Sequence, residues 1–247
     1  MIGVASGLAL TGRTVFTGSF AVFGTGRCWE QIRNTVCDSG LNVKICPTHA
    51  GITVGADGAT HQALEDIALM RVLPGMRVLV PADYASAVAA IRLAAATPGP
   101  FYVRLGREPL PEVYDEGFTC DVAFANVLRE GSDISIMACG VEVAQALAAA
   151  DALAAEGISA EVVDVMSVKP LDEETIIASA AKTGRVLTVE EHSIYRWHGF
   201  RRGRVARREA PRAGDAPGHD DLRPVRRRGR ASCLLWSGCR RYRRPCA

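Results

Sequence analysis

The chain has 247 residues, of which 48% are hydrophobic, and this length and composition suffice for the buried cores of one or two domains. No apolar run approaches the roughly 18 to 20 residues that cross a bilayer, and the start, MIGVASGLAL, lacks the basic region of a signal peptide, so we expect a cytoplasmic protein rather than a membrane-spanning or secreted one. The formal net charge of +2 averages two unlike parts, because residues 195–247 hold 16 Arg, no Lys and 4 acidic residues, whereas residues 1–194 hold 13 basic and 23 acidic residues.

The first part of the chain, residues 1–110, alternates short β-rich runs with helical runs. MIGVASGLALTG is typical of the end of a helix stopped by Gly12, and a β-branched run, TVFT, and a helix through CWEQIRNTVC follow it. We expect strands at NVKICP, RVLVP and FYVRL, with helices at LEDIALMRVL and DYASAVAAIRLAAA. Strands separated by helices predict an α/β fold with a parallel, doubly wound sheet.

The segment from Gly106 to Val122 holds Pro109, Pro111, Gly117 and several acidic residues, and it predicts a linker at residues 111–122 to a second and smaller α/β unit at residues 123–194. In that unit we expect strands at DISIMAC, SAEVVDV and RVLTVEE, and helices at VEVAQALAAADALAAEG and LDEETIIASAAK. The alternation stops near Tyr195, so the second unit is expected to be incomplete.

One loop concentrates polar side chains: THAGITVGADGATHQ, residues 48–62, which follows a predicted strand and precedes a predicted helix. Ligands of open α/β sheets bind beyond the carboxyl ends of strands. Among the glycines of this loop lie His49, Asp57 and His61. Imidazoles near a carboxylate donate to phosphate or hydroxyl oxygens and exchange protons near neutral pH. Each histidine alone also fits a structural role, but the cluster favours a ligand site. The spacing matches no metal-ligand pattern, and we expect no metal site in this chain.

Longer stretches resemble a known family. Three of them resemble the C-terminal section of transketolases: MIGVASGLALTGRTVFTGSFAVFGTGRCWEQIRN, THAGITVGADGATHQALEDIALMRVLPGMRVLVPAD and FYVRLGR. VKPLD and VEEHS resemble the final domain of that family, so the resemblance covers residues 1–194. It implies a thiamine-diphosphate-dependent transfer of a two-carbon ketol unit between sugar phosphates, as in the pentose phosphate pathway. It also implies a pyrimidine-binding domain at residues 1–110 and a C-terminal domain at residues 123–194.

The resemblance assigns roles to individual residues. Phe20 and Phe23 match the aromatic positions that hold the aminopyrimidine ring of the cofactor, although their spacing also fits core packing on a helix. His49 and Arg107 match donors to the sugar phosphate. The expected catalytic residues, Asp57 and His61, match groups that contact substrate hydroxyls beside the reacting carbon.

Four other charged or polar residues near the ends of predicted strands are expected to lie outside this site. Arg104 is expected to point away from Arg107 if the strand continues. Near the last predicted strand, Glu190, Glu191 and His192 are expected to be structural or interface groups.

The resemblance also implies partners. The glutamate that activates the cofactor in this family would precede Met1, and the diphosphate and its Mg²⁺ (or Ca²⁺) would be bound by an N-terminal section. We therefore expect a fragment that is inactive alone, and whose partners are that N-terminal section and a second copy in a homodimer. No membrane and no specific nucleic acid is expected as a partner.

Two alternatives stay open. The 1-deoxyxylulose-5-phosphate synthases share the DG-x-TH core, but carry an acidic residue where this chain has His49. The basic tail would alternatively make the chain a nonspecific binder of polyanions or nucleic acid. When the tail is back-translated with degenerate codons and the reading frame is shifted by one base, it can yield strings that resemble the family's last segment. We therefore interpret residues 195–247 as a frameshift product and expect them to be disordered.

Overall fold

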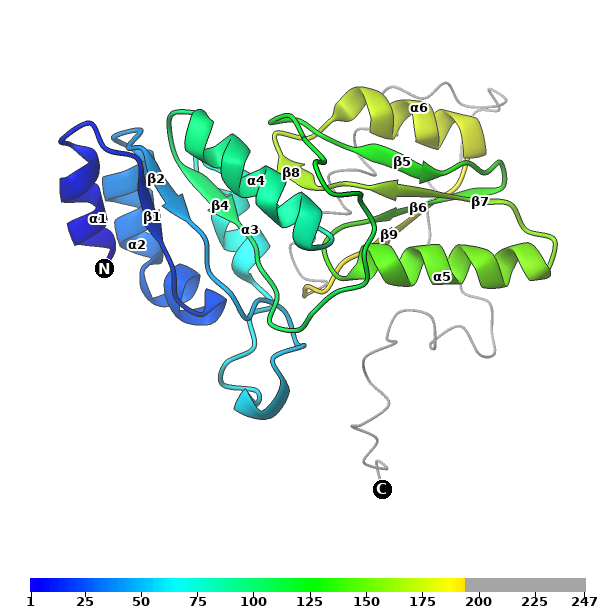
Figure 1. The fold of residues 1–247 in the computed structure, drawn as a ribbon, viewed down its shortest axis with the longest axis horizontal. Coiled ribbons are helices and arrows are strands. Elements are labelled where there is room, and N and C mark those ends of the chain that lie inside the picture. The colour runs from blue at the N-terminus through cyan, green and yellow to red at the C-terminus, as the bar shows by residue number, and fades with distance from the viewer. Residues whose placement is uncertain (194–247) are drawn as a thin grey trace, which may run out of the picture. The chain divides into compact units, whose positions relative to one another are not determined.

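The computed structural model describes residues 1–193, which form two β-sheets with helices (Figure 1). The arginine-rich tail, residues 195–247, lies outside the described residues, and so does its predicted disorder. In the first sheet the strand order is β1, β2, β4, β3, β8, with bounds Val15–Thr17, Val43–Ile45, Phe101–Val103, Arg77–Leu79 and Ser167–Lys169. The first four strands run parallel, which confirms the predicted parallel α/β sheet, and β8 pairs antiparallel with β3.

Both faces of the first sheet are buried. Helices α1, α3 and α4 cover it, with bounds Ile2–Ala9, Asp66–Arg71 and Tyr84–Ala96. Val78 and Tyr102 pack in a core shared with α1 and α3, whereas the next residues along the strands, Leu79 and Val103, pack with α4. Successive side chains on a strand point to opposite faces, so a strand buried on both faces needs a continuous apolar run. This is why RVLVP and FYVRL predict strands correctly.

The chain between β1 and β2 is helical, but it is not one α-helix. Two π-helical turns, Val22–Arg27 and Ile32–Cys37, flank the short helix α2, Trp29–Gln31. The helix predicted through CWEQIRNTVC is therefore present, but only Trp29–Gln31 is α-helical and Ile32–Cys37 has the wider π-helical turns. Thr25 Oγ1 donates to Ala21 O at 2.6 Å, and such a bond to the preceding turn perturbs regular helix geometry.

The second sheet has the strand order β5, β7, β6, β9, with bounds Asn126–Arg129, Ala160–Asp164, Ile134–Ala138 and Val186–Val189. Strands β6, β7 and β9 run parallel, and β5 is an antiparallel edge strand. Two helices pack on this sheet, α5 and α6, with bounds Glu142–Ala155 and Glu173–Thr183. Ile136 and Val162 pack with α5, whereas Met137 and Val163 pack with α6, so this sheet is also covered on both faces.

Strand β8 departs from the sequence prediction, because it comes from the second part of the chain and extends the first sheet. Val78 pairs with Lys169, and Leu79 pairs with Ser167. Lys169 Nζ also donates to Arg71 O at 3.0 Å. The two parts of the chain are thus joined by a shared sheet as well as by the segment between them.

The carboxylate of Asp83 caps α4 and also holds the segment between the sheets. Its Oδ1 accepts from Ser86 N at 2.8 Å, and its Oδ2 accepts from Val113 N and Tyr114 N, each at 2.8 Å. Burial by itself raises the pKa of this carboxyl, but the hydrogen bonds outweigh burial and lower the pKa below its ordinary 3.8. The charged form therefore stabilises the fold above about pH 3.8, and this contribution is lost as the pH falls through the folded-state pKa.

Replacing Asp83 with alanine is expected to lower the free energy of unfolding by about 2–4 kcal/mol near neutral pH, because it removes a helix cap and leaves two further amides without an acceptor. Asp83→Asn is the matched uncharged variant. Urea unfolding should show that the stability gap between wild type and Asp83→Asn shrinks as the pH falls below about 4. A gap that is equal at acid and neutral pH would contradict the role of the charge.

Candidate functional site

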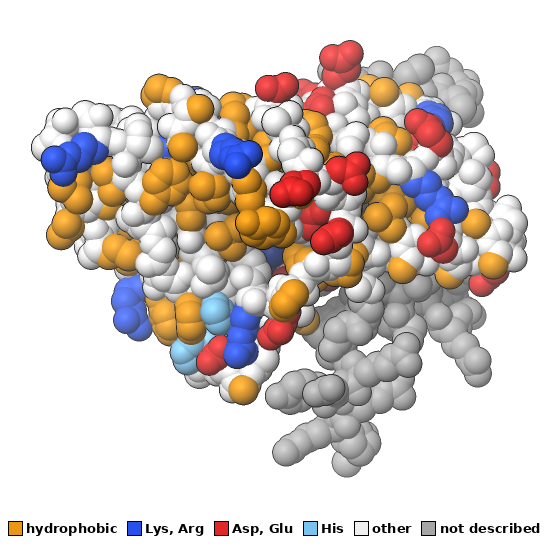
Figure 2. All heavy atoms as spheres, in the orientation of Figure 1, with side chains coloured by type: hydrophobic (Ala, Val, Ile, Leu, Met, Phe, Trp, Pro, Cys, Tyr) orange, Lys and Arg blue, Asp and Glu red, His pale blue; other side chains and the backbone are white. Residues whose placement is uncertain are grey.

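The predicted site residues come from three neighbouring strands of the first sheet. Phe20 follows β1, the loop with His49 follows β2, and Arg107 follows β4. The chain stays paired just beyond the strands, since Phe20 bridges to Thr48 and Ala50 N donates to Leu105 O at 3.2 Å. Because these strands are parallel and adjacent, their carboxyl ends meet at one edge of the sheet. Figure 2 shows histidine side chains on the surface among hydrophobic and charged ones.

Four aromatic rings of the predicted site lie against one another. The ring of His49 stacks on Phe20 with centroids 3.8 Å apart and an interplanar angle of 18°. His61 lies edge-on to Phe20 and Phe23, with centroids 5.8 Å and 5.3 Å away. The two phenylalanine rings are near-parallel at 6.4 Å, and Arg27 lies over Phe23 at 5.1 Å. Both phenylalanines are partly exposed rather than buried in the core, so flat apolar faces border the surface.

Asp57 connects the remaining polar groups of the cluster. Its Oδ2 lies 3.8 Å from His49 Nε2 and 3.4 Å from Arg107 Nη1. Arg107 also donates to the carbonyl oxygen of Val54. The side chains of Asp57 and Arg107 are each 34% exposed, and ion pairs of this kind contribute only about 0–1 kcal/mol. These contacts therefore orient the charged groups and leave them open to a ligand.

The loop backbone has a positive φ at His49 and at Gly55. His49 has a φ of 60°, in the left-handed region that residues with a side chain rarely adopt, and its Nδ1 lies 2.9 Å from Thr48 Oγ1. Such strained backbone is found at ligand sites, where surrounding contacts maintain it. Gly55 has a φ of 62°, and a Cβ there would lie 2.3 Å from Arg107 Nη1. Glycine at this position lets the guanidinium lie against the loop.

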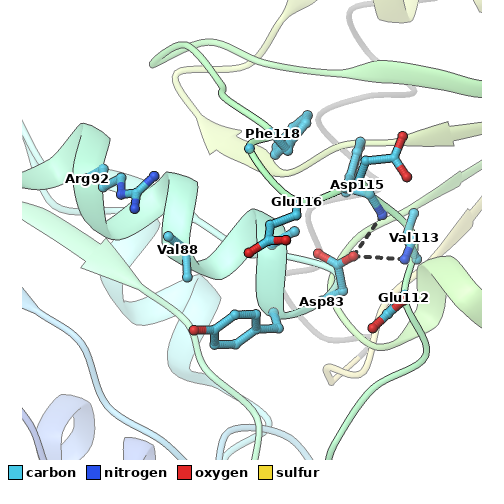
Figure 3. Close-up of a pocket in the computed structure, with 12 residues that line it drawn as sticks. Asp83, Val88, Arg92, Glu112, Val113, Asp115, Glu116 and Phe118 are labelled. Atoms are coloured by element: carbon cyan, nitrogen blue, oxygen red, sulfur yellow. Dashed lines mark hydrogen bonds between the residues drawn. The ribbon is translucent and has the colours of Figure 1, made fainter.

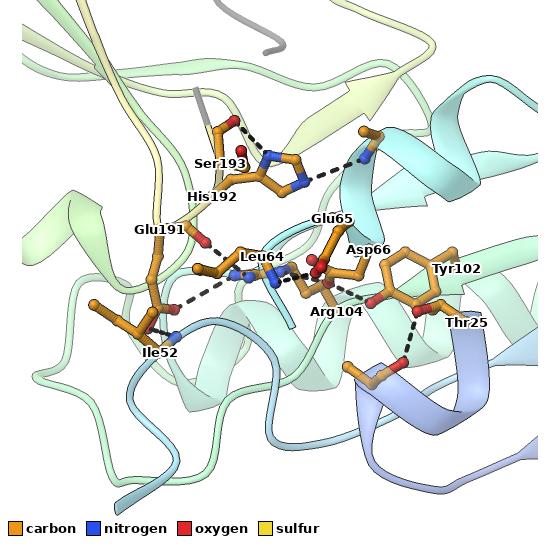
Figure 4. A network of polar contacts seen from close by, with 12 residues as sticks. Thr25, Ile52, Leu64, Glu65, Asp66, Tyr102, Arg104, Glu191, His192 and Ser193 are labelled. Carbon is orange, nitrogen blue, oxygen red and sulfur yellow. Dashed lines mark hydrogen bonds and ion pairs between the residues drawn. The ribbon is translucent and has the colours of Figure 1, made fainter. Parts of the chain in front are cut away.

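The six residues predicted as site residues, Phe20, Phe23, His49, Asp57, His61 and Arg107, are thus brought into one cluster. Arg104 is not among them. It points away from the cluster into a buried network, where its Nε donates to Asp66 Oδ2 at 2.8 Å (Figure 4). Sequence reasoning missed Arg27, whose guanidinium lies over Phe23 within the same π-helical turn.

A separate groove of about 700 Å³ lies between α4 and residues 112–118 (Figure 3). Its lining includes Tyr84, Arg92, Glu112 and Glu116, and none of the six predicted site residues. Asp83, Val113 and Tyr114 also line it, and the two amides donate to the Asp83 carboxylate. This groove belongs to the connection between the sheets and not to the residue cluster.

Two kinds of feature are absent from residues 1–193. None of the helices there has the length and hydropathy to span a membrane. Within the same range, no three His, Cys, Asp or Glu side chains are grouped so as to hold a metal ion.

Comparison with known proteins places this arrangement in a family. Residues 1–112 match the transketolase pyrimidine binding domain, and residues 123–196 match the transketolase C-terminal domain. A solved split-gene transketolase, an inactive beta4 tetramer, matches with a TM-score of 0.80 and 48% identity, over 85% of this chain and 68% of that one. The chain belongs to the transketolase family. The family resemblance and the α/β fold expected from the sequence are thereby confirmed.

Some relatives of this transketolase-family chain are named as sections or subunits. A transketolase C-terminal section from Methanocaldococcus jannaschii is 49% identical over 196 residues, which are 78% of this chain and 61% of that protein. A 6-deoxy-6-sulfo-D-fructose transketolase subunit from Clostridium sp. (strain MSTE9) is 45% identical over 194 residues, which are 78% of this chain and 60% of that protein. The chain therefore spans about three fifths of the length of these relatives.

Proposed function

We propose that this chain forms the pyrimidine-binding and sugar-phosphate-binding part of a thiamine-diphosphate-dependent transketolase, which transfers a two-carbon ketol unit between sugar phosphates in cytoplasmic carbohydrate metabolism. The observation that carries the proposal is the convergence of Phe20, His49 and Arg107 from three parallel strands into one cluster with Asp57 and His61. These residue types provide apolar ring faces, donors to an anion and groups that exchange protons near neutral pH.

The aromatic part of the cluster fits the aminopyrimidine ring of thiamine diphosphate. Phe20 and Phe23 present near-parallel rings, and both border the surface. Flat apolar walls suit a planar heteroaromatic ring, and the π-helical turn that begins two residues after Phe20 carries Phe23. When bound, thiamine diphosphate supplies the electron-accepting group through which a ketol unit is cleaved from one sugar and added to another.

The polar part of the cluster fits a phosphorylated sugar. Arg107 offers a forked donor and His49 a second donor, and the contact of each with Asp57 Oδ2, at 3.4 Å and 3.8 Å, holds them on the same side of the loop. Thr60 Oγ1 lies 3.0 Å from His61 Nδ1, so we assign the other ring nitrogen of His61 to a substrate hydroxyl. On this proposal Asp57 and His61 contact the hydroxyls next to the reacting carbon and exchange protons with them.

The proposed partners are an N-terminal transketolase section and a second copy of this chain. The diphosphate and its Mg²⁺ (or Ca²⁺) would be bound by the N-terminal section. Relatives named as a C-terminal section and as a subunit, together with a split-gene transketolase that is an inactive beta4 tetramer, support a protein that acts only in an assembly. We expect this chain to be inactive alone.

A ketol-transfer assay with pentose phosphates, thiamine diphosphate and Mg²⁺ tests the proposal. The chain would be measured alone, with the N-terminal section of a split transketolase, and with that section after extension by the codons upstream of Met1. No transfer is expected from the chain alone, and the highest rate is expected from the third form, which tests whether the activating glutamate is encoded upstream. Absence of transfer in the third form, with both chains folded and associated, would contradict the proposed function.

A further inference from the structure

A carboxylate from the second part of the chain binds the backbone of the loop that carries His49 and Asp57. Glu191 lies beyond β9, yet its Oε1 accepts from Ile52 N at 2.8 Å and Thr53 N at 2.9 Å (Figure 4). It also accepts from Thr53 Oγ1 at 2.8 Å. Three donors on one oxygen form a binding site for the loop backbone. Glu191 is only 8% exposed, so these hydrogen bonds are shielded from water.

The loop is shaped to admit this carboxylate. Gly51 has a φ of 81°, and a Cβ there would lie 1.9 Å from Glu191 Oε2. Any side chain at this position would displace the carboxylate, in addition to straining the backbone. Gly51 also bridges to Ala63, which ties the beginning of the loop to its end. The loop between these two points carries Asp57 and His61.

Glu191 is itself held from the first sheet. Arg104 Nη1 lies 3.6 Å from Glu191 Oε2, and Arg104 Nη2 donates to Glu191 O at 3.0 Å. The next two residues are also fastened to the first part of the chain. Ala68 N donates to His192 Nε2 at 3.3 Å, and Ser193 N donates to Leu64 O at 2.8 Å. The segment after β9 is therefore a fixed element against which the loop is placed.

We propose that Glu191 is a positioning residue for the substrate site, through which the second α/β unit sets the conformation of the loop bearing His49 and Asp57. The role of that loop in binding sugar phosphate rests on the proposed function. Glu191 acts on the backbone three and four residues beyond His49, and its loss releases two amides and a hydroxyl from a common acceptor. The loop then samples other conformations, and Asp57 no longer keeps its contacts with Arg107 and His49.

Hydrogen exchange in the isolated chain tests the contact without any need for activity. In Glu191→Ala, exchange of the Ile52 and Thr53 amides is expected to speed up by about 10- to 100-fold, while the amides of β2 and β4 change little. Glu191→Gln should restore most of the protection, because its amide oxygen accepts the same three hydrogen bonds. Glu174→Ala, an exposed glutamate on α6, is the matched control and should leave exchange unchanged. Unchanged protection at Ile52 and Thr53 in Glu191→Ala would overturn the proposal.

Kinetics in the active assembly separate positioning from general stability. Glu191→Ala is expected to raise KM for the phosphorylated sugar by about 10-fold or more with a smaller change in kcat, and Glu191→Gln should recover most of it. A lowered melting temperature with normal KM would show a merely structural role. If wild type itself transfers no ketol unit, the proposed function fails while the exchange result still decides the contact.

The close approach of Glu191 to Gly51 can be tested by a double variant. Gly51→Ala should speed up amide exchange in the loop less in the Glu191→Ala background than in wild type, because the carboxylate that its Cβ would meet is gone. Equal effects in both backgrounds would contradict the close approach.

Discussion

Replacing Arg104 with methionine is expected to lower the free energy of unfolding by about 3–5 kcal/mol, because the change leaves a buried carboxylate without its counter-charge. The side chains of Arg104 and Asp66 are 5% and 0% exposed, and the guanidinium Nε lies 2.8 Å from Asp66 Oδ2. Tyr102 donates to the same oxygen at 2.6 Å. Methionine matches the length of the arginine stem but offers no donor, so Asp66 would keep only the tyrosine.

The charges in this network depend strongly on one another. Burial by itself lowers the pKa of Arg104, but Asp66 and Glu191 outweigh burial and raise it above its ordinary value. Burial, followed by the charge of Asp66, raises the pKa of Tyr102 well above 10.0, so the phenol stays a donor. Asp66 Oδ1 is buried and has no hydrogen-bond partner within residues 1–193. The site therefore has few means of compensating for the loss of the guanidinium.

Urea unfolding near neutral pH measures the effect. The double variant Arg104→Met with Asp66→Asn should recover part of the loss, since it removes both charges together. Arg185→Met changes an exposed arginine and is the matched control, for which a change within about 0.5 kcal/mol is expected. An Arg104→Met variant within about 1 kcal/mol of wild type would show that the network does not hold the fold together.

Sequence reasoning succeeded where the local pattern and the fold class carried the information. NVKICP, RVLVP and FYVRL are apolar runs of strand length between helical runs, which is the pattern of a parallel sheet buried on both faces. Such a sheet places ligands at the carboxyl ends of its strands. His49 and Arg107 follow two neighbouring strands, so the sequence predicts that they lie at one site, and in the structure both contact Asp57.

Contacts between residues far apart in the chain could not be predicted from the sequence. Strand β8 is three residues long and pairs with β3, about 90 residues earlier, so its partner is chosen by tertiary packing and not by its own sequence. Glu191 and Ile52 lie 139 residues apart, and the charge pattern around Glu191 looks like any exposed strand end. Gly51 marks a special backbone position, but a glycine in a sequence does not reveal which atoms occupy the space of its missing side chain.

The partners of Arg104 could not be predicted from the sequence. Strand β4 ends at Val103, so the alternation expected for a continuing strand does not apply to Arg104, which lies in the buried network with Asp66. Its contact with Asp66 joins the residue after β4 to the first turn of α3, and its contacts with Glu191 join the same residue to the segment after β9. Those elements are adjacent only in the folded chain. The residues that support the loop are therefore less visible in the sequence than the residues the loop presents.

Replacing Arg107 with alanine is expected to raise KM for the phosphorylated sugar by about 10- to 100-fold in the assembly that transfers ketol units. On the proposed function, the guanidinium donates to the substrate phosphate, and a hydrogen bond to a charged group contributes about 1.5–3 kcal/mol. Stability should change by less than about 1 kcal/mol, because the contact of Arg107 with Asp57 at 3.4 Å is between side chains that are each 34% exposed. Arg107→Ala is thus expected to change KM strongly and stability little, whereas Arg104→Met is expected to change stability strongly.

The comparison of phosphorylated and unphosphorylated acceptor sugars decides whether Arg107 recognises phosphate. In wild type the phosphorylated sugar should have the lower KM, and Arg107→Ala should remove most of that preference while leaving the unphosphorylated sugar little changed. Arg107→Lys should retain part of it, since an ammonium keeps the charge but loses the fork that matches two phosphate oxygens. Arg13→Ala removes an exposed arginine near the end of α1 and serves as the control for net charge. If Arg107→Ala weakened both sugars equally, its guanidinium would be shaping the loop through Val54 and Asp57 rather than binding phosphate.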